Sequence, residues 1–283
     1  MGTGEGERPL EEGIRTDLRG AMSYSDYLDL PTLLSAQHPR SRPEHHDELL
    51  FIVAHQTSEL WLKLVLHELH GARELLAADE VAQARKCLAR VKHVLRTLAD
   101  QWSVLATLTP HDYAQFRGAL ASASGFQSWQ YRAVEFILGN KHAGMLSVFA
   151  ADPEAQALLS RLLAELTVYD AFLGLLARAG HPVPEAILER DLTRAWVQQP
   201  ELIPVLREIY LDAEANWEAY ATCEDLVDIE DAFQLWRFRH MRTVQRTIGW
   251  RQGTGGSSGV AFLKRALELS FFPELITVRG ALD

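Results

Sequence analysis

The stretch that decides the fold runs from Asp47 to Leu76 and reads DELLFIVAHQTSELWLKLVLHELHGARELL. Its apolar residues recur every three or four positions, which predicts one long helix that begins after the turn at Arg42-Pro43. An imidazole interrupts the apolar stripe of this helix, because His55 lies one turn beyond Phe51 on the same face. A face that should be packed therefore carries a group able to donate and accept protons.

Two interpretations of His55 stay open at this point. A histidine in a packed face is most often satisfied by a hydrogen bond to nearby backbone, or here to Glu59 one turn on, because buried polar groups are usually paired. The alternative is a functional imidazole that faces a ligand. The choice between them depends on the rest of the chain.

Composition excludes several classes of protein. The chain has 283 residues, 47% hydrophobic and 23% charged, which is typical of a globular protein with a sizeable core. A formal net charge of −10 argues against binding to nucleic acid or to an anionic membrane surface. The two cysteines, Cys87 and Cys223, are far apart and form no zinc, covalent haem or disulfide pattern, so we expect a cytoplasmic location.

The beginning of the chain differs from the rest. Residues 1–20 are polar and rich in Gly, Glu and Arg, with no apolar segment of a secretory signal, and we expect them to be a disordered tail. Residues 21–283 contain no linker or repeat and are expected to form a single domain. Since no run approaches eighteen uncharged apolar residues, we expect no membrane span.

Helical periodicity continues through most of the chain. A sharp helix start is predicted at Thr109-Pro110, where Thr109 caps the helix and Asp112 completes a capping box. The other predicted helices are Val81–Val104, Phe126–Leu138, Pro153–Arg178, Pro184–Ala195, Glu201–Tyr210, Asp212–Trp250 and Val260–Leu269. The only short candidate for a strand is Leu275–Val278. The predicted fold is therefore all-α, a helical bundle with long antiparallel helices.

A second histidine interrupts an apolar stripe near the end of the long C-terminal helix. His240 shares a helical face with Phe233, Trp236 and Val244. As for His55, a core histidine without a function explains the pattern equally well, and here a tryptophan would pack against it. Two such stripes in one all-α chain also suit a non-covalently bound haem, which needs an apolar slot and one neutral nitrogen on the iron.

Tyr113 and Arg117 form a third group of interest, one turn apart at the start of a helix. The guanidinium offers a planar fork that matches a carboxylate, and the tyrosine adds a hydroxyl. The pair is therefore a candidate carboxylate site. An exposed arginine stacked over a tyrosine is an equally common explanation.

The glycine-rich segment Gly253–Gly259 reads GTGGSSG. It lacks the lysine of a P-loop and follows a helix where a dinucleotide fingerprint requires a strand. We expect a mobile loop that closes over a site, with Thr254 free to donate its hydroxyl and Ser257 or Ser258 capping the last helix. A plain solvent-exposed connection explains the segment equally well.

Four segments together resemble the tryptophan 2,3-dioxygenase family. They are residues 51–61 (FIVAHQTSELW), residues 107–117 (TLTPHDYAQFR), residues 124–136 (SGFQSWQYRAVEF), and His240 followed by the loop 253–259. The resemblance extends from about Tyr24 to the C-terminal end. It implies an all-α homotetramer in which the helices enclose a haem pocket, and an enzyme that opens the indole ring of L-tryptophan with O₂ to give N-formyl-L-kynurenine, the first step of the kynurenine pathway.

The resemblance also implies roles for single residues. His240 matches the axial ligand of a non-covalent haem b, one per subunit and ferrous when active, and His55 matches the catalytic distal histidine that hydrogen-bonds the indole N–H. Arg117 and Tyr113 match the carboxylate site. The remaining matches are Thr254 at the amino-acid head group, Phe51 in the indole pocket, Trp102, Ser124 and Gly125 along the haem, and Tyr24, Tyr27 and Leu28 in a segment that reaches the neighbouring subunit's pocket.

Small departures and other functions accompany this reading. Ala54 stands where the family often has a longer polar residue, and Trp129 interrupts a run at a variable place. Neither change removes a functional group.

Three other functions are alternatives. They are a relative that acts on a substituted indole, a haem-binding sensor without turnover, and a helical interaction module with two core histidines and no cofactor.

Overall fold

The computed structural model describes residues 10–283, and these divide into two compact units, one ending at His38 and one from Pro39 to Asp283. The first unit contains two short helices, α1 (Tyr24–Tyr27) and α2 (Leu30–Leu34). Residues 1–9 of the expected tail lie outside the described residues. Residues 10–20 contain no helix or strand, so the disordered tail stays a prediction.

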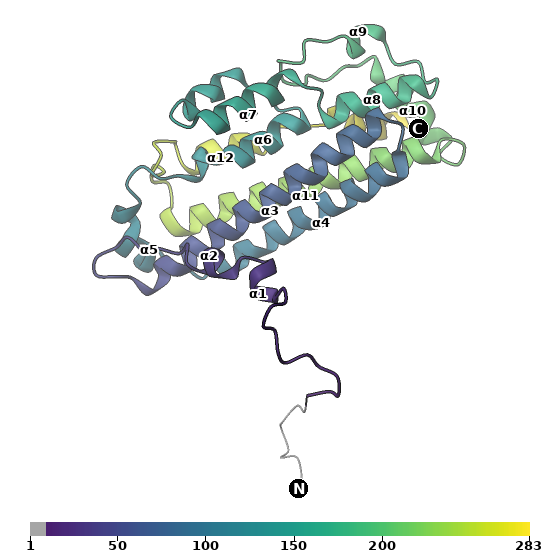
Figure 1. Cartoon of the computed structure of the whole chain (residues 1–283). Helices are drawn as coiled ribbons and strands as arrows, with labels where there is room; N and C mark the ends of the chain where they lie inside the picture. Colours follow the sequence, from purple (N-terminus) through teal and green to yellow (C-terminus); the bar gives the residue numbers. More distant parts are fainter. Residues whose placement is uncertain (1–9) are drawn as a thin grey trace. The chain divides into compact units, whose positions relative to one another are not determined.

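The second unit is built on three long helices, α3 (His46–Ala77), α4 (Val81–Leu105) and α11 (Trp217–Ile248) (Figure 1). The other elements are α5 (Pro110–Phe116), α6 (Trp129–Leu138), α7 (Pro153–Ala164), α8 (Val168–Arg178), α9 (Glu185–Leu188), α10 (Leu202–Leu211), α12 (Val260–Ala266) and α13 (Pro273–Thr277), with 3₁₀ turns η1 (Arg117–Leu120), η2 (Gly125–Gln127), η3 (Ala143–Phe149) and η4 (Val278–Ala281). No strand occurs within residues 10–283. The all-α prediction is confirmed.

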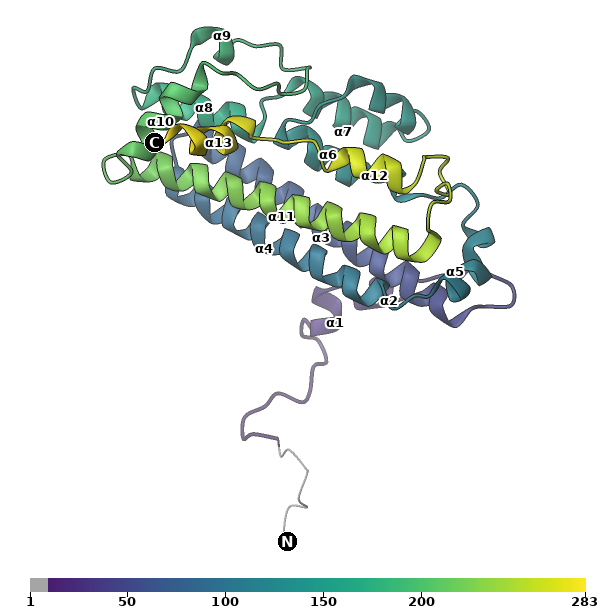
Figure 2. The same ribbon diagram turned by 180° about the vertical axis from the view of Figure 1, so that it is seen from behind.

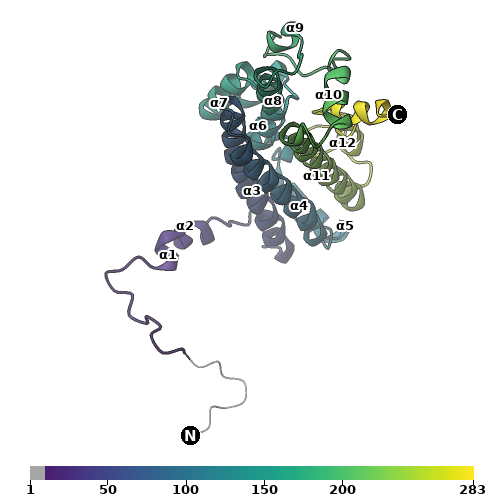
Figure 3. The ribbon, with the colours of Figure 1, turned by 90° about the vertical axis from the view of Figure 1, so that its right-hand side faces the viewer.

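The long helices do not all alternate in direction. Along α4, Arg85 pairs with Asp225 and Lys92 with Asp228 of α11, so the residue numbers of both helices rise together and the two helices run in the same direction. Helix α3 is antiparallel to α4, since the two are joined by a tight turn. Figures 2 and 3 show α3, α4 and α11 side by side. Because α4 and α11 are parallel, the chain must return between them through residues 106–216.

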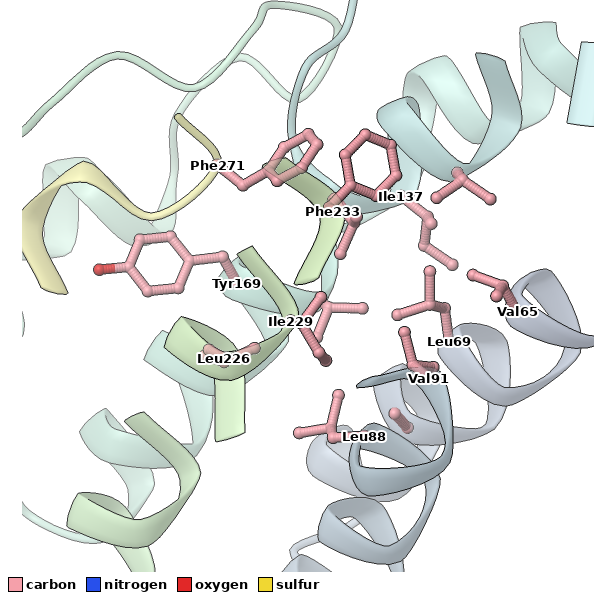
Figure 4. Packing of buried hydrophobic residues seen from close by; sticks show 14 of the residues in the cluster. Val65, Leu69, Leu88, Val91, Ile137, Tyr169, Leu226, Ile229, Phe233 and Phe271 are labelled. Atoms are coloured by element: carbon pink, nitrogen blue, oxygen red, sulfur yellow. The ribbon is translucent and has the colours of Figure 1, made fainter. Parts of the chain in front are cut away.

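The core lies where α3, α4, α6, α8 and α11 meet (Figure 4). Its side chains come from every third or fourth position of these helices, as the periodicity predicts. The labelled residues are Val65 and Leu69 from α3, Leu88 and Val91 from α4, Ile137 from α6, Tyr169 from α8, Leu226, Ile229 and Phe233 from α11, and Phe271.

Several predicted boundaries are wrong. The continuous helix predicted over Pro153–Arg178 is broken between α7 and α8, where Thr167 and Asp170 form a capping box that starts a new helix. The helix predicted over Pro184–Ala195 is limited to the four residues of α9, and Leu275–Val278 is helical rather than a strand. Apolar periodicity continues across the break between α7 and α8, so only the capping box marks it.

Helix α3 is long and apolar enough to cross a membrane by length and composition alone, but only 17% of its apolar stretch is buried within this chain. Leu49, Val53 and Leu60 lie on one helical stripe and are between 42% and 49% exposed. One helix of this kind does not distinguish a membrane span from a core or interface helix. The absence of a membrane span therefore stays a prediction.

A buried lysine side chain connects separate parts of the segment between α4 and α11. Lys141 follows α6 and is 3% exposed, and its Nζ donates to the carbonyl oxygens of Leu163 (3.0 Å), Glu165 and Leu192 (2.8 Å). The carbonyls of Leu163 and Glu165 lie at the C-terminal end of α7, and that of Leu192 lies in the segment after α9. One side chain therefore donates to three carbonyl oxygens from two separate segments of the chain.

We expect Lys141→Met to lower the free energy of unfolding by about 2 kcal/mol or more, because it removes the donor of one buried and two partly buried carbonyls while keeping most of the side-chain volume. Urea denaturation followed by circular dichroism measures this. Lys86→Met, on the exposed side of α4, is the control and should change the stability little. Equal stability of the two variants would contradict the role given to Lys141.

Candidate functional site

The first half of α3 presents a neutral imidazole. His55 Nδ1 lies 2.7 Å from the carbonyl oxygen of Phe51, one turn earlier, and the two rings are 4.1 Å apart. Burial lowers the pKa of His55, although the Phe51 carbonyl and the Glu59 charge oppose the shift. Because a carbonyl only accepts hydrogen bonds, Nδ1 carries the proton and Nε2 is left as an acceptor.

An aromatic wall continues from α3 to α5. The ring centroid of Phe51 lies 6.0 Å from that of Tyr113 and 5.6 Å from that of Phe116. The rings of Tyr113 and Phe116 pack edge to face. Helix α5 begins as predicted, with Thr109 as the cap and Asp112 completing the box. The cap fixes the first turn of α5 and therefore the place of Tyr113 beside Phe51.

Arg117 stands where α5 becomes η1 and has an incomplete set of partners. Its Nη2 donates to the carbonyl oxygen of Gln252 at 2.8 Å, whereas its buried Nε has no hydrogen-bond partner among the described residues. Burial raises the pKa of Tyr113, and the Arg117 guanidinium opposes this shift. A cavity of about 500 Å³ adjoins the guanidinium and is lined by Ala114, Arg117, Gly118, Ala121, Arg251, Gln252, Gly253 and Thr254.

The loop between α11 and α12 rests on the segment before α6. Thr254 Oγ1 donates to the carbonyl oxygen of Ala123 at 2.6 Å, so its hydroxyl is engaged here rather than free. A Cβ on Gly255 would lie 2.7 Å from Cβ of Ser124, which explains why no side chain stands there. The contact brings Ser124, the N-cap of η2, and Thr254 to the same place.

The predicted serine cap of the last helix is wrong. Gly259 occupies the N-cap of α12 with φ 60°, and α12 has no side-chain cap. A Cβ on Gly259 would lie 2.5 Å from the carbonyl oxygen of Arg251, so only glycine fits. The sequence indicates a loop at residues 253–259 but not the close approach of Gly255 to Ser124, and it does not mark Arg251 or Gln252, because backbone approach of this kind leaves no motif.

The last turns of α11 present the second imidazole. His240 stacks on Trp102 of α4, with ring centroids 4.6 Å apart and planes 10° from parallel. Burial lowers the pKa of His240 to about 4, and the charge of His55 contributes to the shift. The imidazole is therefore neutral at neutral pH, and the two histidines lie close enough to influence each other.

The residues around His240 fit a haem. Within residues 10–283, no three His, Cys, Asp or Glu side chains are grouped to hold a metal ion, whereas one neutral histidine suits an iron whose other ligands come from a macrocycle. The indole N–H groups of Trp102 and Trp236 are buried without a partner in the described part of the chain. Buried donors without partners are unusual in a finished core and are compatible with a further polar ligand.

The structure does not bring every predicted residue together. Phe51, His55, Tyr113 and Arg117 form one group, and Trp102 and His240 form a second. Thr254 contacts Ala123 beside Ser124 and also lines the same cavity as Arg117, and Gly125 follows Ser124 in η2. Tyr24 and Tyr27 of α1 and the adjacent Leu28 belong to the first unit and are exposed. Their place in a neighbouring subunit's pocket stays a prediction.

Comparison with known proteins covers nearly the whole chain. A family model described as tryptophan 2,3-dioxygenase matches residues 9–160 and 161–282. The chain is 62% identical over 275 residues to the tryptophan 2,3-dioxygenase of Kineococcus radiotolerans, covering 97% of this chain and 96% of the relative. It is 63% identical over 272 residues to that of Saccharopolyspora erythraea (96% and 97%) and 59% identical over 279 residues to that of Rhodococcus jostii (99% and 98%).

Proposed function

The chain belongs to the tryptophan 2,3-dioxygenase family, and we propose how its own residues carry out the activity of that family. The enzyme opens the indole ring of L-tryptophan with O₂ to give N-formyl-L-kynurenine, the first step of the kynurenine pathway. The family is haem-dependent. The proposal rests above all on one observation: Gln101 of α4 contacts Ala54 and Ser58, which flank His55, and the next residue, Trp102, stacks on His240.

In this proposal each subunit would hold one non-covalent haem b, ferrous when active, and His240 would bind its iron. The neutral imidazole of His240 offers a lone pair, and its stacking on Trp102 limits rotation of the ring. Trp102, Ser124 and Gly125 would border the macrocycle. When bound, the haem supplies the site at which O₂ is held and activated.

The carboxylate of L-tryptophan is assigned to Arg117 and Tyr113. The unpartnered Nε of Arg117 provides one donor, and Nη2 becomes available when the Gln252 carbonyl gives way. Thr254, which now donates to Ala123, would turn to the amino-acid head group as its loop closes. Phe51 and Phe116 would enclose the indole ring from one side.

His55 orients the indole in this proposal. Its Nε2 has no proton, because Nδ1 donates to Phe51, and it can accept the indole N–H. An indole N–H is too weak an acid for a histidine near its ordinary pKa, or below it, to ionise easily. The bond therefore aligns the ring for attack at its C2–C3 bond rather than removing a proton.

The proposed assembly is a cytoplasmic homotetramer that acts without nucleic acid or membrane. The exposed stripe of Leu49, Val53 and Leu60 on α3 is the kind of surface that a second subunit covers. Tyr24, Tyr27 and Leu28 would then reach into the neighbour's pocket. Cys87 and Cys223 are free thiols, which suits a reducing compartment.

The cofactor assignment is tested by His240→Ala. We expect the wild-type protein, reconstituted with haem and reduced, to form N-formyl-L-kynurenine from tryptophan and O₂, and the variant to retain about a tenth of the haem or less. Soret absorbance per chain measures the loss. His67→Ala, exposed on α3, is the control. Full haem content in His240→Ala would contradict the assignment.

The orienting role of His55 predicts a partial defect. We expect His55→Ala to lower kcat/KM for tryptophan roughly five- to tenfold, because a neutral hydrogen bond contributes about 1 kcal/mol. The variant should also discriminate less between tryptophan and N1-methyltryptophan, which has no N–H to offer. Complete loss of turnover with normal haem and substrate binding would instead indicate an obligatory base.

The carboxylate site predicts a larger effect. Arg117→Ala should lower kcat/KM for tryptophan by roughly thirtyfold or more, because a charge-assisted contact contributes about 2 kcal/mol or more. Steady-state kinetics measures the change. Arg117→Lys keeps the charge without the planar fork and should recover only part of the loss. Unchanged kinetics in Arg117→Ala would place the carboxylate elsewhere.

A further inference from the structure

Helix α6 contacts both histidine-bearing helices through buried polar side chains. On one side, Gln130 Nε2 donates to the carbonyl oxygen and to Oε2 of Glu59, each at 2.8 Å, one turn beyond His55 on α3. On the other side, Glu135 Oε1 accepts from Arg237 Nη2 of α11 at 2.6 Å. The second carboxylate oxygen of Glu135 contacts Arg132 of α6 itself.

The Arg237 guanidinium is bound in several directions. Its side chain is 4% exposed, its Nε donates to the Tyr131 hydroxyl at 3.2 Å, and its Nη1 donates to the carbonyl oxygen of Ala266 at 2.9 Å. Its central carbon lies 4.6 Å from the Phe233 ring centroid. Ala266 ends α12, the helix that follows the Thr254 loop. One side chain therefore ties α11 to α6 and to α12.

Arg237 lies one helical turn before His240 on α11. The adjacent Trp236 packs against Tyr131 of α6, with ring centroids 5.4 Å apart. A rotation or shift of the last turns of α11 would break the bonds of Arg237 to Glu135, Tyr131 and Ala266 together. The rotation of α11 at Arg237, and hence the direction of the His240 imidazole, is set by these directional bonds.

Stability alone does not account for this ionic cluster. Taking Arg132, Glu135 and Arg237 out of water has a large desolvation cost, and apolar residues of similar volume often stabilise a core as well or better. What an ion pair with fixed donor directions adds is a defined register between the elements that carry it. The cluster of Arg132, Glu135 and Arg237 joins α6 to α11, which carries His240, and to α12, which follows the Thr254 loop.

We propose that Arg237, held by Glu135, is a positioning residue for His240. It fixes α11 against α6 so that the imidazole meets the haem iron in one orientation, while Gln130 and Glu59 fix the α3 side. The inference rests on the proposed role of His240 as the axial ligand. It adds that α6, which contributes no ligand itself, sets the spacing between the helices that carry the two imidazoles.

The test compares Arg237→Met, Arg237→Lys and Glu135→Gln with a matched control, Arg190→Met. Arg190 forms an equally close ion pair with Asp170 (2.6 Å), lies over the Trp196 ring and is 14% exposed, but it joins α8 to the segment after α9. Each protein is reconstituted with haem. The readouts are haem affinity, the absorption spectrum and reduction potential of the bound haem, and the unfolding midpoint.

We expect Arg237→Met to weaken haem affinity at least about tenfold and to alter the absorption spectrum and the reduction potential of the bound haem. Residues that orient a metal ligand affect both metal affinity and potential. Glu135→Gln should change them in the same direction, and Arg237→Lys should recover part of the wild-type values. Arg190→Met should lower the unfolding midpoint while leaving affinity, spectrum and potential unchanged.

A wild-type spectrum and potential in Arg237→Met would overturn the proposal, as would losses of haem in Arg237→Met and Arg190→Met that simply follow their losses of stability. If Arg237→Met does not fold, Glu135→Gln and Arg237→Lys decide by the same criteria. Haem retention by His240→Ala would instead contradict the axial assignment itself. The two failures are therefore distinguishable.

Discussion

The parallel packing of α4 against α11 constrains the rest of the structure. Two long helices that run in the same direction cannot be joined by a short turn, so the chain needs a long return passage. Residues 106–216 form that passage, and its first part contains Tyr113 and Arg117. The same arrangement brings the C-terminal turns of α4 and α11 together, where Trp102 meets His240. The contact between Trp102 and His240 therefore follows from the parallel packing of α4 against α11.

Local signals in the sequence predicted much of the fold. The capping box at Thr109 is a property of a few neighbouring residues, and the structure has it. The direction of α11 relative to α4 is not local, and periodicity says nothing about it. The break before α8 was missed because apolar spacing continues across it, although Thr167 and Asp170 mark it.

Some residues of the candidate site could be predicted from the sequence, and others could not. Histidines that interrupt apolar stripes are visible in a sequence, and so are the resembling motifs. Gly255 and the Gln252 carbonyl act through backbone approach, which depends on how distant segments meet. Arg237 gave no signal either, because an arginine on a helix is usually exposed, and only its burial beside Glu135 distinguishes it.

On the proposed assignment of the substrate carboxylate to Arg117, the hydrogen bond from Arg117 to Gln252 has a consequence for substrate choice. Binding of an amino acid at this guanidinium exchanges a neutral backbone acceptor for a charged one, so the measured affinity is a difference between two bonds. Indole or tryptamine brings no carboxylate and has nothing to offer in that exchange. If Arg117 binds the carboxylate as proposed, the Gln252 carbonyl competes with the ligand for this guanidinium, and this competition disfavours indoles that lack a carboxylate.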